Sequence, residues 1–79
     1  MSDDFSRRLA MLRQDNKISQ KDAAAALGIS QALLSHYERG RRGCNLEFLL
    51  KVADYYNVSC DYLLGRSPVK TGATITYED

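Results

Sequence analysis

Apolar and polar positions along most of the chain recur with the period of α-helices. Phe5, Leu9 and Leu12 follow the i, i+4, i+7 spacing that places side chains on one face of a helix. Ser2 or Asp3 can cap the start of this helix, because their side-chain oxygens accept hydrogen bonds from free backbone N–H groups. A polar stretch then interrupts the pattern, which predicts that the first helix ends there.

Signals for a second helix follow directly. Ser19 begins the sequence Ser-Gln-Lys-Asp, which is close to a capping box, with Asp22 in the place usually held by glutamate. The alanines at 23–26 favour a helix. Ala24 is small enough to let a neighbouring helix cross closely. Gly28 suits the left-handed conformation that ends a helix, so the second helix is predicted to stop there.

A third helix begins almost immediately. Ser30 is its predicted cap, and the helix over 31–39 ends at Gly40. The helical period predicts a buried side made of three residues, which are Ile29, Leu34 and Tyr37. The same period predicts an outward side made of Gln31, Ala32, Leu33, Ser35, His36 and Arg39.

Two further helices complete the pattern. Asn45 caps the fourth helix, and Ser59 and Gly65 bracket a short fifth one. The inward residues of the fourth helix are predicted to be Leu46, Leu49, Leu50, Ala53 and Tyr56. No segment before Ser67 alternates as a strand would. The sequence therefore predicts an all-α fold of five helices, in one domain at 1–66.

The segment 67–79 does not follow the helical pattern of the rest of the chain. Ser67 and Pro68 break the helical pattern, and 73–77 is rich in β-branched residues that pair well as a strand. The simplest interpretation is a mobile chain end. The alternatives are a dimer contact or an anchoring segment.

Size and composition restrict the classes of protein. The chain has 79 residues, of which 44% are apolar and 27% charged, so it fits one small globular domain. It has no run of about 18 apolar residues and no signal peptide, which predicts a cytoplasmic protein with no membrane partner. Cys44 and Cys60 lack the spacing of a zinc site and are predicted to be free thiols. No metal, cofactor or catalytic group is predicted.

Charge is distributed unevenly along the chain. The net charge is +1, but the segment 7–42 carries eight bases against three acids and the remainder three bases against seven acids. A basic half of this kind can bind a polyanion such as DNA while the other half stays free. An ordinary solvated surface is the equally simple alternative.

Two helices joined by a short turn that contains glycine form a helix-turn-helix, whose second helix enters the major groove of DNA. The outward side of the helix over 31–39 suits this role. A glutamine such as Gln31 can pair with adenine, and the apolar groups of Ala32 and Leu33 can meet a thymine methyl. An enzyme is not supported, because Ser35 and His36 point in different directions on their helix.

Six segments together resemble the Xre family, the lambda-repressor-like helix-turn-helix domains. They are I-S-Q at 18–20, A-x-x-L-G at 24–28, I-S-Q at 29–31, Y-E-R-G at 37–40, L-x-x-L-L-K-V-A at 46–53 and N-V-S-C-D-Y-L-L-G at 57–65. The resemblance covers roughly 5–65. The chain departs from many relatives at Ala23, where they carry leucine, and near Cys44, where they carry proline.

The resemblance implies roles for individual residues. Gln20 would bind a phosphate and brace Gln31, and Arg13 would pair with Glu38 near a phosphate. An equally simple interpretation makes this pair a scaffold salt bridge. His36 would contact a base or a phosphate, with a pH sensor as the weaker alternative. The base-facing set is Gln31, Ala32, Leu33 and His36. The phosphate-contacting set is Gln20, Ser30, Ser35, Arg13, Arg39, Arg41 and Arg42.

The function implied is a transcriptional regulator, a repressor that binds double-stranded DNA. One recognition helix reads too few base pairs to select a site in a genome, so a homodimer on a near-palindrome is expected. Candidate dimer residues, each of which could instead be core, are Phe48, Tyr55, Tyr62 and Leu64. The alternative is a protein-interaction module, such as an antitoxin, with a protein partner on the acidic half.

Overall fold

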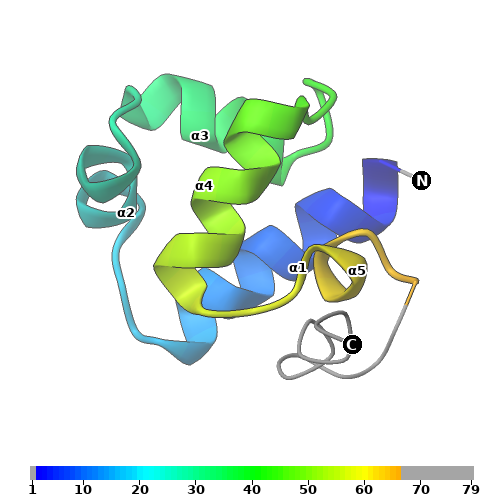
Figure 1. Ribbon diagram of the computed structural model, residues 1–79. Coiled ribbons are helices and arrows are strands. Elements are labelled where there is room, and N and C mark those ends of the chain that lie inside the picture. Colours follow the sequence, from blue (N-terminus) through cyan, green and yellow to red (C-terminus); the bar gives the residue numbers. More distant parts are fainter. Residues whose placement is uncertain (1, 67–79) are drawn as a thin grey trace.

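The computed structural model describes residues 2–66, and all regular structure in this range is helical, which confirms the predicted fold class (Figure 1). The helices are α1 (Ser2–Asp15), α2 (Gln20–Leu27), α3 (Gln31–Glu38), α4 (Leu46–Tyr56) and α5 (Cys60–Leu63). The segment 67–79, with its predicted strand or mobile end, and the capping side chains of Ser2 and Asp3 lie outside the described part.

Four predicted caps are present at the starts of helices. In each, a side-chain oxygen accepts a hydrogen bond from the backbone N–H three residues later, at 2.8–3.0 Å. The capping residues are Ser19, Ser30, Asn45 and Ser59. Such caps contribute about 1 kcal/mol each, because they satisfy backbone donors that a helix leaves free.

Each of the five helices is followed within two residues by one with positive φ, and these residues are Lys17, Gly28, Gly40, Asn57 and Gly65. After α3, the Gly40 N–H donates to the Tyr37 carbonyl and the Arg41 N–H to the His36 carbonyl. This pair of bonds is the Schellman motif. The predicted stops at Gly28, Gly40 and Gly65 are confirmed.

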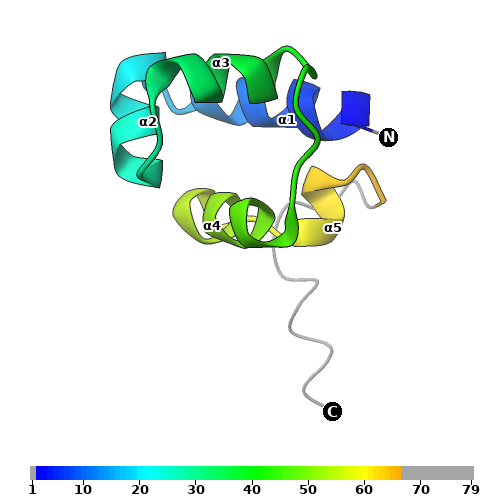
Figure 2. The same cartoon turned by 90° about the horizontal axis from the view of Figure 1, so that it is seen from above.

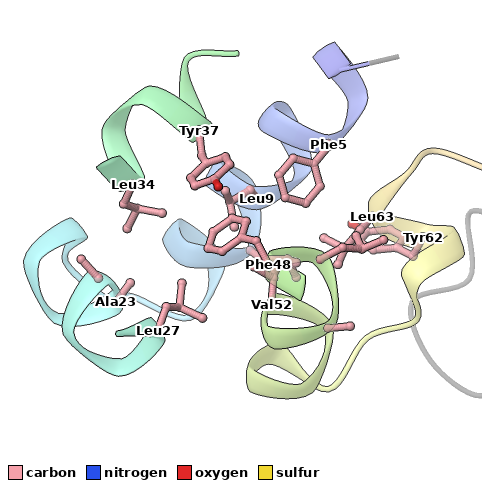
Figure 3. Close-up of a cluster of buried hydrophobic side chains, with 14 residues drawn as sticks. Phe5, Leu9, Ala23, Leu27, Leu34, Tyr37, Phe48, Val52, Tyr62 and Leu63 are labelled. Atoms are coloured by element: carbon pink, nitrogen blue, oxygen red, sulfur yellow. The ribbon is translucent and has the colours of Figure 1, made fainter. Parts of the chain in front are cut away.

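The core lies between two groups of helices. Figure 2 shows α1, α2 and α3 on one side and α4 and α5 on the other. At the centre, the rings of Tyr37 and Phe48 stack with centroids 4.0 Å apart, and Phe5 meets Phe48 edge-on (Figure 3). Leu34 and Val52 are fully buried beside them. Each large buried side chain stabilises the fold by about 1.5–3 kcal/mol.

The predicted inward side of α4 is wrong at two positions. Leu46 is 70% exposed and Leu50 is 48% exposed, whereas Phe48 and Val52 are buried. Apolar residues surround most of this helix, so its period alone does not choose the buried stripe. The choice is made by the packing partners, since the aromatic core of α1 and α3 receives Phe48.

Two of the four candidate dimer residues belong to the core. Phe48 and Tyr62 are 5% and 7% exposed, so the expectation that they face a partner is wrong. The ring of Tyr62 is covered by the Arg8 guanidinium, 4.5 Å from its centroid. Tyr55 is exposed, at 41%, and Leu64 is partly buried against the core.

Candidate nucleic-acid interface

α2 and α3 form a helix-turn-helix joined by the turn 28–30 (Figure 1). Ala24 is buried and α3 turns Leu34 and Tyr37 into the core, as the sequence predicts. Ile29 in the turn packs against the core from a partly buried position. The Lys51 ammonium of α4 donates to the Leu27 carbonyl over 3.2 Å and so ties the end of α2 to the second helix group. These contacts fix the angle at which α3 is presented.

Most of the predicted outward side of α3 is exposed. Gln31, Ala32, His36 and Arg39 face solvent. Ser35 is half-buried. Leu33 is not fully outward, because it is partly buried and packs against the core. Leu33 therefore lies at the edge of the surface, so only part of its side chain is available to a ligand.

A chain of hydrogen bonds leads from the start of α3 to α1. The Gln31 amide nitrogen (Nε2) donates to Oε1 of Gln20 at 3.5 Å. Nε2 of Gln20 donates to Oε1 of Glu38 at 3.2 Å. Arg13 donates to Glu38 through Nε at 2.7 Å and through Nη2 at 3.1 Å. The contact between the two glutamines and the pair of Arg13 with Glu38 agree with the resemblance to the Xre family.

The Arg13–Glu38 pair joins three parts of the chain. The two side chains are 16% and 7% exposed, and Nη1 of Arg13 also donates to the Ile18 carbonyl at 3.0 Å. The hydrogen bonds to Glu38 raise the pKa of the Arg13 guanidinium, although burial opposes this. The pair thus holds the end of α3 against α1 and the α1–α2 connection. Neither the bond from Gln20 to Glu38 nor the bond to Ile18 was predicted.

Tyr56 of α4 is half-buried against the core, on the side of the helix that the sequence predicted to face inward. Its hydroxyl is buried, and it has no hydrogen-bond partner among the described residues. Burial raises the pKa of Tyr56 to about 12, Tyr55 and the negative charge of Glu38 raise it further by smaller amounts, and the positive charge of Arg13 opposes them. Helical spacing predicted the inward position of Tyr56 but carried no signal for the state of its hydroxyl.

Basic side chains follow the C-terminal end of α3. Arg39, Arg41 and Arg42 are exposed, and none of them forms an ion pair within residues 4–66. The bond from the Arg41 N–H to the His36 carbonyl fixes the start of this loop. Glutamine and histidine on α3 are thus flanked by unpaired positive charge, an arrangement that attracts polyanions.

Cys44 and Cys60 are free thiols, and burial is the main cause of the raised pKa of both. In the part of the chain that the structure describes, no three His, Cys, Asp or Glu side chains are grouped to hold a metal ion. None of the helices in this part is long and apolar enough to cross a membrane.

Similarity to known proteins agrees with this geometry. A family model described as helix-turn-helix matches residues 9–63. The HTH-type transcriptional regulator ImmR of Bacillus subtilis is 46% identical over 82% of this chain and 51% of its own length. AnsR of the same organism, also an HTH-type transcriptional regulator, is 39% identical over 84% of this chain and 57% of its own. The chain thus spans about half the length of these relatives.

Solved structures show the same arrangement of helices. The P22 c2 repressor in complex with a synthetic operator superposes with a TM-score of 0.73 at 30% identity, covering 80% of this chain and 96% of its own. The restriction-modification controller protein C.AhdI of Aeromonas hydrophila gives 0.72 at 29% identity, covering 78% and 94%. This chain therefore belongs to the helix-turn-helix family, among its Xre and lambda-repressor-like members.

Proposed function

We propose that this chain is a sequence-specific DNA-binding domain of a cytoplasmic transcriptional repressor, with α3 in the major groove. The observation that carries the proposal is the tethered amide of Gln31. Its exposed side chain is connected through Gln20 and Glu38 to Arg13, so a base-reading group is held before DNA arrives. Preorganisation of this kind raises affinity because less side-chain freedom is lost on binding.

The exposed residues of α3 suit base edges. A glutamine amide can bond N6 and N7 of adenine in the major groove, which assigns Gln31 to this role. Ala32 offers a methyl group to thymine, His36 can donate to a base or a phosphate, and Leu33 adds apolar contact from the edge of the surface. Their common position on α3 supports reading by one helix.

Phosphate contacts are assigned to residues around α3. Arg13 has five N–H donors and the structure uses three of them within the protein, which leaves two for a phosphate. The other phosphate-contacting residues are Gln20, Ser30, Ser35, Arg39, Arg41 and Arg42. Contacts of this kind fix orientation and affinity rather than sequence preference.

The proposal includes a homodimer on a near-palindromic operator, with the two α3 helices about 34–36 Å apart. Tyr55 and Leu64 remain candidates for the dimer surface. Leu46 and Leu50 join them, because their exposure leaves apolar side chains on α4 without a partner in the described part of the chain. The operator-bound repressor among the structural relatives supports the repressor role.

In-vitro selection of randomised duplexes by the purified chain tests the proposal. We expect an enriched near-palindrome whose half-sites are about one helical turn apart. If the selected site is a single half-site, the proposed homodimer is contradicted, but sequence-specific binding is not. Weak, unselective binding that disappears with salt would contradict sequence-specific function. In that case a protein-interaction role, such as that of an antitoxin, becomes the better interpretation.

A further inference from the structure

The residues assigned to base reading and the candidates for the dimer surface belong to different groups of helices. The base-reading side chains are all on α3, which lies in one group with α1 and α2 (Figure 2). The dimer candidates all belong to α4 or to the end of α5, and they are Leu46, Leu50, Tyr55 and Leu64. In a homodimer joined through these side chains, the distance between the two α3 helices depends on how the helix-turn-helix is held against α4 and α5.

The two flanks of α3 are held in different ways. Toward α1, the Glu38 carboxylate accepts bonds from Arg13 at 2.7 and 3.1 Å and from Gln20 at 3.2 Å. Toward α4, there is a cleft of about 170 Å³ instead. It is lined by Ile29, Tyr37, Asn45, Glu47, Phe48 and Lys51. Side-chain packing therefore leaves space on the α4 flank, into which the helix-turn-helix could tilt.

Lys51 of α4 joins the helix-turn-helix to α4 at this cleft. Its ammonium donates to the Leu27 carbonyl at 3.2 Å. Within residues 4–66, this is the one hydrogen bond between the helix-turn-helix at 20–38 and either α4 or α5. Leu27 is the last residue of α2, where free carbonyls and the helix dipole favour a positive charge. The bond has a fixed direction, whereas burial of the surrounding apolar side chains is non-directional.

We propose that Lys51 holds the helix-turn-helix in place relative to the dimer surface and thereby selects the spacing between the two half-sites of the operator. This inference rests on the proposed function. Adding or removing one base pair moves a half-site by about 3.4 Å along the duplex and turns it by about a tenth of a turn. An α3 that is firmly held accepts one spacing, and an α3 that can tilt accepts several. Lys51 is thus a positioning residue, which acts through Leu27.

Lys51→Met tests the inference, because methionine keeps an apolar stem and removes the ammonium. Binding is measured to three duplexes, with the selected half-sites at the selected spacing, one base pair closer and one base pair farther apart. The wild type should prefer the selected spacing. Lys51→Met should reduce this preference about two- to tenfold, the factor that corresponds to one hydrogen bond. Lys51→Arg keeps a charged donor and should restore most of the preference.

Glu47→Gln is the matched control. Glu47 is exposed and lines the same cleft one helical turn before Lys51, but it forms no hydrogen bond or ion pair within residues 4–66. Its loss of charge can change the affinity for all duplexes alike and should leave the spacing preference as it is. A spacing preference that Lys51→Met leaves unchanged, or that Glu47→Gln reduces equally, overturns the inference.

A duplex with a single half-site separates positioning from a general loss of binding. Lys51 acts between the two groups of helices, so Lys51→Met should bind the single half-site as tightly as the wild type. An equal loss at the single half-site and at the full site would assign Lys51 to the reading of bases, which overturns the inference.

The wild-type protein separates this inference from the proposed function. A wild type that selects no sequence overturns the proposed function, and the inference with it. A wild type that selects one spacing, and whose preference survives Lys51→Met, overturns the inference alone.

Discussion

Replacing Arg13 by methionine should remove a large part of the stability of this domain. Methionine keeps the apolar stem of the side chain but none of its donors. Glu38, with its side chain 7% exposed, would retain only the 3.2 Å bond from Gln20, and the Ile18 carbonyl would lose the 3.0 Å bond from Arg13. A carboxylate in this position is poorly hydrated and has lost its counter-charge.

The magnitude follows from the burial of the pair. Removing one partner of a fully buried ion pair costs about 3–5 kcal/mol, whereas exposed pairs contribute at most about 1 kcal/mol. Arg13 is 16% exposed and Glu38 7%, so the pair is closer to the buried limit and about 3 kcal/mol is expected. A domain of 79 residues has a total stability of about 4–12 kcal/mol, so this loss is readily measured.

Urea unfolding followed by circular dichroism measures the loss, with Arg13→Met compared to Glu38→Leu and to the double variant. The double variant should be more stable than Arg13→Met alone, because it contains no unpaired buried charge. A cost below about 1 kcal/mol for Arg13→Met, with additive effects in the double variant, would show that solvent screens the pair. The reasoning from burial would then be wrong.

Three further predictions concern the proposed interface and the turn that presents it. Gln31→Ala should cost about 1–3 kcal/mol at the selected duplex and relax preference at one base position, as measured by competition between single-base variants of the site. Arg42→Ala should weaken binding to all sequences alike and lower the salt slope by about one; a sequence-selective loss would assign Arg42 to a base instead. Gly28→Ala should destabilise the fold by about 1–2 kcal/mol, since φ is +74° and an added Cβ would meet only the Lys51 ammonium at an ordinary 3.6 Å. A negligible change in the urea midpoint of Gly28→Ala would contradict this cost.

The helix-turn-helix was predictable because its signals are local. Ser19, Ser30 and Gly28 act on backbone groups within a few residues, so their chemistry determines the helix ends whatever the rest of the chain does. The buried positions of α3, Leu34 and Tyr37, were predictable for a related reason. Apart from Leu33, which was predicted to face outward and is partly buried, the residues around them are polar or small, so the helical period selects one stripe.

The sequence by itself thus determined five helices, their caps and stops, and the polar outward side of α3. Only the tertiary structure decided which stripe of α4 is buried, because Leu46, Phe48 and Leu50 are equally apolar and their burial depends on the helices that pack against them. It alone also joined Gln20 and the Ile18 carbonyl to the Arg13–Glu38 pair. These groups come from separate segments of the chain, and only the packing of α1, α2 and α3 against one another brings them together.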